Sequence, residues 1–197
     1  FTALLVVNRP GTGTGTVTSS PPGISCGSTC AVWLDGGTLV TLTATPGTGS
    51  TFAGWNGCSS TSGNTCMVTM DAAKTVTAVF VTPSYGVDVG KAGTGGGTVT
   101  SAPGGIYCGS VCSAFFAYGT ELRLMASPDP SSSFMGWSGA CTGTTDCYLS
   151  VTSNRSVTAV FSLNSYVFTV TRIGSGTVTS APAGISCGET CAATYGA

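Results

Sequence analysis

An internal repeat is the strongest constraint on how this chain folds. The segment GTVTS begins at Gly15 and returns at Gly97 and at Gly176, with spacings of 82 and then 79 residues. Two cysteines four positions apart follow each copy. Self-similarity at a fixed period is typical of tandem arrays in which each copy is one small folding unit. We therefore predict one β repeat at 1–82, a second at 85–162, and a truncated third at 166–197.

The third copy holds only the first part of a repeat. A partial unit of this kind cannot close its own hydrophobic core. We therefore expect it to pack against further repeat sequence beyond Ala197 or against a neighbouring chain.

Apolar and hydroxylated residues alternate along stretches of each complete copy. Val40, Leu42 and Ala44 alternate with threonines, and VTAVF recurs near the end of both complete copies. A period of two is typical of strands with one buried face, and Val and Thr suit a pleated sheet. Only residues 71–74 offer a candidate helical turn. The pattern predicts an all-β fold of tandem, small antiparallel modules, each β-sandwich or β-grasp-like, stapled by disulfides into an elongated array.

Ten cysteines in a chain of 197 residues indicate an oxidising compartment, since a reducing cytosol would keep them as thiols. Four cysteines in each complete copy allow three pairings. The third copy carries only two, so if no thiol is free these two pair with each other, and the same local pairing extends to the other copies. The predicted disulfides are Cys26–Cys30, Cys58–Cys66, Cys108–Cys112, Cys141–Cys147 and Cys187–Cys191.

The chain is almost uncharged, with six basic and seven acidic side chains and a net charge of −1. Nucleic acids and anionic membrane surfaces both attract clustered Lys and Arg, which this sequence lacks. It also has no apolar run of the length that crosses a bilayer. We predict no nucleic-acid partner and no membrane insertion, and we expect that any signal peptide has been removed or lies upstream.

The residues that hydrolytic or redox chemistry requires are missing or do not recur. The chain has no His, and Asp35 and Asp71 become Ala117 and Thr152 in the second copy. The Cys pairs lack the ligand number of a zinc site, and the Gly-rich loops lack the Lys-Ser/Thr ending of a phosphate loop. We predict no catalytic, cofactor-binding or metal residue, and therefore no enzyme.

Two groups of aromatic residues have different expected roles. Trp55 and Trp137 each follow a Phe and a Gly once per complete copy, which favours packing over the sheet rather than a carbohydrate-stacking surface. Trp33, Tyr107 and Phe115 are the candidates for an exposed binding surface.

The ordered set of motifs is similar to a known family. GTVTS, PxGIxCGxxC, VTLTATP, FxGW, a loop bracketed by cysteines and VTAVF follow one another along essentially the whole chain. This order resembles the divergent internalin-B-type B-repeat of bacterial surface and secreted proteins. The resemblance implies small β-rich modules, strung in tandem outside the cell as spacers, stalks or adhesive elements, with no catalytic residues.

These inferences predict a structural, secreted bacterial protein at the cell surface, a segment of a stalk, filament or appendage. Its expected partner is a homopolymer or a continuation of the same array. One alternative is an adhesin, or a carbohydrate- or protein-binding module, that engages a glycan or a host surface. Another is an accessory module of a larger secreted enzyme.

Overall fold

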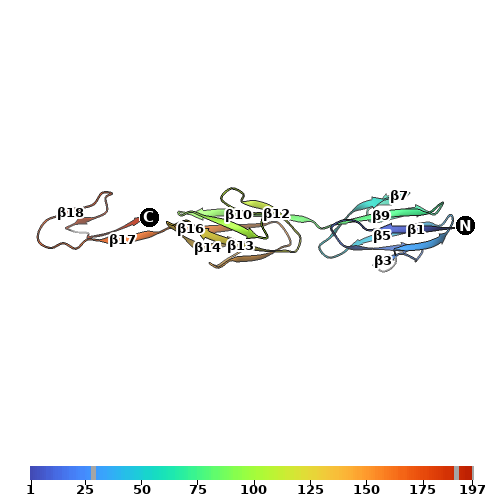
Figure 1. Cartoon of the computed structure of the whole chain (residues 1–197), viewed down its shortest axis with the longest axis horizontal. Helices are drawn as coiled ribbons and strands as arrows, with labels where there is room; N and C mark the ends of the chain where they lie inside the picture. The colour runs from blue at the N-terminus through green and yellow to red at the C-terminus, as the bar shows by residue number, and fades with distance from the viewer. Residues whose placement is uncertain (28–29, 189–190, 197) are drawn as a thin grey trace. The chain divides into compact units, whose positions relative to one another are not determined.

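The computed structural model describes residues 1–27, 30–188 and 191–196, so Ala197 lies outside the described residues (Figure 1). All regular elements in this part of the chain are strands, which confirms the all-β class. Residues 71–74 form a bend that enters a strand, so the candidate helical turn was wrong. The chain divides into two compact units, Phe1–Ser84 with Ala117–Gly119, and Tyr85–Phe116 with Thr120–Ala197.

The first repeat folds as two sheets with the strand orders β4-β1-β9-β6 and β3-β2-β5-β8-β7. Their bounds are β1 (Thr2–Asn8), β2 (Gly15–Ser20), β3 (Ser25–Cys26), β4 (Ala31–Asp35), β5 (Leu39–Pro46), β6 (Thr51–Asn56), β7 (Ser60–Ser62), β8 (Thr65–Thr69) and β9 (Lys74–Val81). Apolar side chains of both sheets form one buried core that includes Leu5, Leu42 and Phe80. This is a β-sandwich, one of the two predicted architectures.

The second repeat builds the same sandwich from sheets ordered β12-β10-β16-β14 and β11-β13-β15. Their bounds are β10 (Ser84–Gly93), β11 (Gly97–Ala102), β12 (Ser113–Ala117), β13 (Thr120–Pro128), β14 (Ser132–Gly139), β15 (Cys147–Val151) and β16 (Arg155–Leu163). Val87, Leu124 and Phe161 lie in its separate core.

The alternation predicted along VTLTATP is confirmed, because Val40, Leu42 and Ala44 are all fully buried in the first repeat.

One parallel strand pair closes each complete repeat, and the other pairs with a described register in these repeats are antiparallel. β1 runs parallel to β9 with Val7 opposite Val76, and β10 runs parallel to β16 with Val89 opposite Val157. Parallel neighbours need a long crossover connection, and here nearly the whole repeat forms it. The VTAVF strand therefore joins the last part of each repeat to its first strand.

The first residue of GTVTS is a glycine because the last residue of VTAVF packs on it. A Cβ atom built on Gly15 would overlap the Phe80 ring, and one on Gly97 would overlap the Phe161 ring. Neighbouring rings complete the contact, with Phe52 5.6 Å from Phe80 between ring centroids. The two motifs that recur most clearly in the sequence are thus one packing unit.

The third, partial copy contains four short strands in two pairs. β17 (Ser165–Thr169) pairs with β20 (Ala192–Gly196), and β18 (Val178–Thr179) pairs with β19 (Ser186–Cys187). These are the counterparts of β1 with β4 and of β2 with β3.

Candidate functional site

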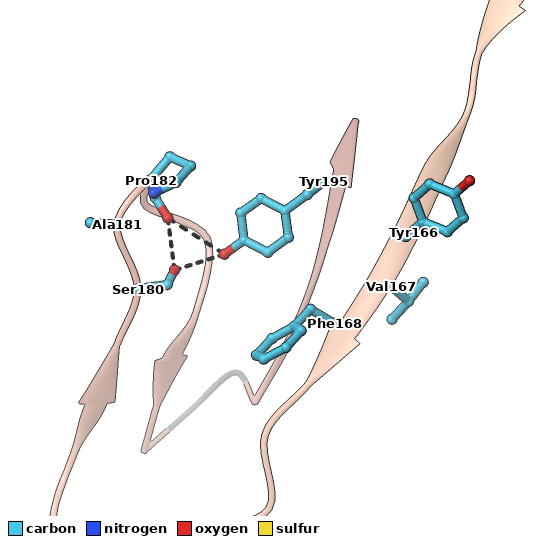
Figure 2. A pocket seen from close by; sticks show the side chains of 7 residues that line it. All are labelled: Tyr166, Val167, Phe168, Ser180, Ala181, Pro182 and Tyr195. Carbon is cyan, nitrogen blue, oxygen red and sulfur yellow. Dashed lines mark hydrogen bonds between the residues drawn. The ribbon is translucent and has the colours of Figure 1, made fainter. Parts of the chain in front are cut away.

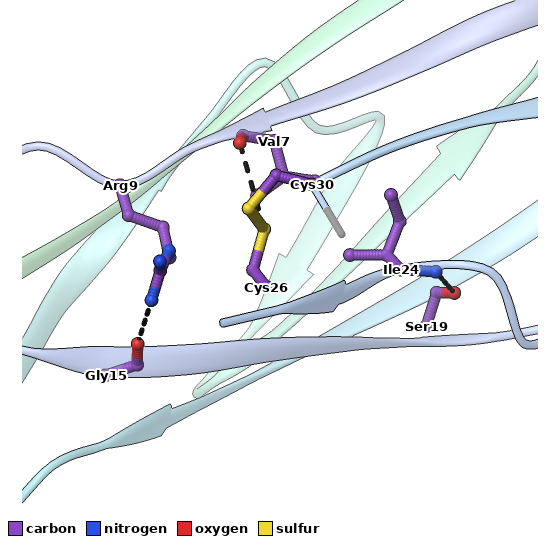
Figure 3. Close-up of a disulfide and its surroundings, with 7 residues drawn as sticks. All are labelled: Val7, Arg9, Gly15, Ser19, Ile24, Cys26 and Cys30. Atoms are coloured by element: carbon purple, nitrogen blue, oxygen red, sulfur yellow. Dashed lines mark hydrogen bonds between the residues drawn. A yellow bond between two sulfur atoms is a disulfide. The ribbon is translucent and has the colours of Figure 1, made fainter. Parts of the chain in front are cut away.

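The ten cysteines form five disulfides, and none of them is free. The pairs are Cys26–Cys30, Cys58–Cys66, Cys108–Cys112, Cys141–Cys147 and Cys187–Cys191. This is the local pairing that the third copy favours. In the first repeat the staple lies beside β1, because the backbone N–H of Val7 donates to the carbonyl of Cys30 at 2.8 Å. Figure 3 shows the Cys26–Cys30 disulfide next to the Val7 carbonyl, which lies 3.9 Å from Cys26 Sγ. Val89 with Cys112 and Val170 with Cys191 make the same backbone contact, so each of these staples lies beside the first strand of its copy.

A serine in GTVTS organises the turn that precedes each staple. The Ser19 hydroxyl donates to the Pro21 carbonyl at 2.7 Å. It also accepts the Ile24 N–H at 2.9 Å, as Figure 3 shows. Ser101 and Ser180 make the same two bonds in the other copies. The recurrent Ser therefore has a structural role, since it satisfies backbone groups that no strand pairs.

A basic side chain crosses the loop before GTVTS in each copy. Arg9 donates to the carbonyl of Gly15 (Figure 3). In the same way Lys91 donates to the carbonyl of Gly97 at 3.0 Å, and Arg172 donates to that of Gly176. Sequence reasoning treated these cations as scattered single charges. The cation precedes the glycine by six residues in the first two copies but by only four in the third. This change in spacing hid the recurrence of the cation from the sequence comparison.

The tryptophans of FxGW pack inward. Trp137 is only 5% exposed, its Nε1 donates to the Thr145 carbonyl at 2.7 Å, and its ring meets Phe134 edge-on. Trp55 is half-buried and meets Phe52 edge-on at 5.3 Å between centroids. The core interpretation is confirmed for both residues, although Trp55 is less deeply buried.

The aromatic residues considered for binding are exposed. Trp33 on β4 is 66% exposed and Phe115 on β12 is 78% exposed, at matching positions of the two complete repeats. Tyr107, in the loop before β12, is 57% exposed. The third copy has Thr194 at the position of Trp33 and Phe115, so this aromatic surface is not shared by every copy.

Two ion pairs lie on the surface of the described part of the chain, Lys74 with Asp71 and Arg123 with Asp146. The Lys74 ammonium, by its hydrogen bond and its charge, lowers the pKa of Asp71, and Asp146 likewise raises the pKa of Arg123. Such exposed pairs contribute little to stability. Within the described ranges, no group of three or more His, Cys, Asp or Glu side chains could hold a metal ion. The same ranges contain no helix that could cross a membrane.

Exposed apolar side chains gather in the third copy instead. Its strands line a pocket of about 390 Å³ that is open to solvent. The lining residues are Tyr166, Val167, Phe168, Ser180, Ala181, Pro182 and Tyr195. Figure 2 shows the Phe168 and Tyr195 rings between β17 and the Ser180–Pro182 turn, where the Tyr195 and Ser180 hydroxyls are 2.7 Å apart. The polar contacts stay inside the turn, so the pocket offers mainly an apolar surface.

The repeated sandwiches, their staples and their shared turns define a protein of tandem β repeats. The family of the divergent InlB B-repeat domain matches residues 5–84 and 87–165. The chain belongs to this family, which confirms the resemblance seen in the motifs. No curated protein matches the sequence.

A solved structure from a bacterial protein shares the fold of this chain. The TIE protein of Bacillus anthracis superposes with a TM-score of 0.56 at 8% identity, covering 100% of this chain, which spans 43% of that protein's length. The major pilin protein (T-13) of Streptococcus pyogenes gives 0.40 at 7% identity over 83% of this chain and 97% of its own. The minor pilin GBS52 of Streptococcus agalactiae gives 0.29 at 7% identity over 88% and 100%. The two pilin likenesses are too weak to establish a shared fold.

Proposed function

We propose that this chain is a structural segment of an extracellular bacterial array, in which repeats at 1–82, 85–162 and 166–197 serve as modules of a stalk, filament or appendage. The observation that carries the proposal is the set of contacts that the copies share. All three share the Cys staple, the Ser-centred turn and the cation that crosses the loop. Every shared feature stabilises a module, and none forms a reactive site.

The surface supports the same role. Its charged and aromatic groups differ between copies, as Asp71 and Thr152 or Trp33 and Thr194 illustrate. Disulfides persist in oxidising surroundings, which supports a location at the bacterial surface. With few charges to keep modules apart, strand edges and hydroxyl-rich faces favour contacts with further copies of the repeat rather than with nucleic acid or membrane.

Electron microscopy of the native material tests this proposal. We expect a continuous fibre with a repeating unit, and we expect it to persist in about 1 M NaCl, because such salt screens ion pairs but not backbone pairing or apolar contacts. Isolated globular particles would contradict the array. Fibres that dissolve in high salt would show that charge pairs hold the modules together.

An adhesive module is the second candidate, favoured by the matching exposure of Trp33 and Phe115. Flat exposed aromatics can stack on sugars or insert into a protein partner. A glycan screen should then show binding that the double variant Trp33→Ala, Phe115→Ala loses. Tyr148→Ala is the matched control, because Tyr148 is 70% exposed on another sheet. A wild-type chain that binds nothing in glycan and host-protein screens leaves only the spacer role.

A further inference from the structure

The third copy is folded like the first half of a complete repeat. The Val170 N–H donates to the Cys191 carbonyl at 2.8 Å, as Val7 does to Cys30 and Val89 does to Cys112. The pairing of β17 with β20 also follows that of β1 with β4, because Val167 lies opposite Thr194 as Leu4 lies opposite Trp33. Positions in the third copy can therefore be matched one by one with those of the complete repeats.

Two strand edges that are paired in the complete repeats are open in the third copy. β1 lies between β4 and β9, and β10 lies between β12 and β16, whereas β17 pairs only with β20 among the described strands. Likewise β2 pairs with β5 and β11 with β13, whereas β18 in the described chain pairs only with β19. Unpaired N–H and C=O groups along such an edge form a template for an added strand.

Side chains beside these edges are exposed where their counterparts are buried. Phe168 stands at the position of Leu5 and Val87, which are both 0% exposed, yet it is 60% exposed. Val178 stands at the position of Val17 and is 39% exposed, against 0% for Val17. The exposure is local, since Ile185 and Cys187 in the same copy are 3% and 0% exposed, like their counterparts in the complete repeats.

Gly176 marks the place of a missing ring. In the complete repeats its counterparts Gly15 and Gly97 lie directly under Phe80 and Phe161, the last residues of VTAVF. A Cβ atom on Gly176 would meet nothing within 4 Å among the described residues. The position that a phenylalanine ring fills in the complete repeats is therefore open in the third copy.

We propose that this face of the third copy binds the second half of a divergent InlB B-repeat, with a VTAVF-type strand parallel to β17 and a VTLTATP-type strand antiparallel to β18. The register follows from the complete repeats, where the first Val of VTAVF lies opposite Val7 and Val89. The incoming Val therefore lies opposite Val170, and the incoming Phe covers Gly176. This inference rests on the proposed function only in taking the partner from the same repeat family.

A designed extension of the full chain tests the proposal. Residues 119–163 of the second copy are appended directly after Ala197, which occupies the sequence position of Tyr118. We expect amide exchange in β17 and β18 to slow by at least about 100-fold, because strand pairing and burial protect backbone amides from local opening. The matched control has the same extension with Val157→Asp and Phe161→Asp made only in the appended segment. It should leave exchange in β17 and β18 as fast as in the original chain.

Equal exchange rates in the extended chain, the control and the original chain would overturn the proposal. So would a concentration-dependent dimer of the original chain in which β17 and β18 are already protected, because a second copy would then cover the face. Electron microscopy of the native material tests the proposed array independently of this experiment. If the native particles are globular but β17 and β18 are protected in the extended chain, the array is wrong and this inference stands. If the native material forms fibres but β17 and β18 stay unprotected in the extended chain, the array stands and this inference is wrong.

Discussion

Replacing Phe161 by alanine is expected to lower the free energy of unfolding of the second repeat by about 3–5 kcal/mol, the usual cost of emptying a fully buried phenylalanine site. Phe161 is 0% exposed, and its ring centroid lies 5.5 Å from that of Phe134. It also covers Gly97, which has no side chain of its own to fill the cavity. Urea denaturation followed by circular dichroism measures the change.

Phe115→Ala is the matched control, because it removes the same side chain from the same repeat at a position that is 78% exposed. An exposed substitution of this kind should change the free energy of unfolding by no more than about 0.5 kcal/mol. Equal losses for the two variants would show that the VTAVF phenylalanine is not the centre of the core.

Reduction of the disulfides is expected to lower the melting temperature of each complete repeat by roughly 15–30 °C. Each repeat has one staple that closes a separation of four residues and another that closes six or eight. Loops of this size restrict the unfolded chain by about 2 kcal/mol each, and about 4 kcal/mol corresponds to that shift in a domain of some 80 residues. Calorimetry of the oxidised chain and of the reduced, alkylated chain measures the effect.

A variant that lacks one staple provides the control for chemical damage during reduction. Cys141→Ala with Cys147→Ala should show about half of the decrease in the second repeat without any reductant. Domains of some 80 residues bury small cores, so we expect the staples to supply a large share of their stability. A melting temperature that does not change after complete reduction, verified by mass spectrometry, would contradict this expectation.

Several features could be predicted because they depend on residues close together or on comparison of the copies. The alternation around Leu42 depends only on the strand period, and it places that residue in the core. The third copy, with Cys187 and Cys191 alone, favoured the staple that the structure shows. The family could be inferred because its motifs occur in a fixed order along the chain.

Other features required the neighbours that folding provides. Trp55 and Trp137 occupy matching positions of the FxGW motif, and only the packing of each sandwich leaves the first partly buried and the second 5% exposed. The cation that crosses the loop was hidden because the loop before Gly176 is two residues shorter than its counterparts. The open pocket beside Phe168 could not be predicted either, since the sequence does not say which strand edges find partners.

The sequence by itself determined that this protein is all-β, built from tandem repeats and stapled locally, because the strand period, the internal copies and the short Cys spacings act over a few residues or repeat along the chain. Only the tertiary structure decided that the first and last strands of a repeat run parallel and that Phe161 packs on Gly97. These contacts join residues more than 60 positions apart. Their geometry depends on how two sheets share one core, a property that no short segment carries.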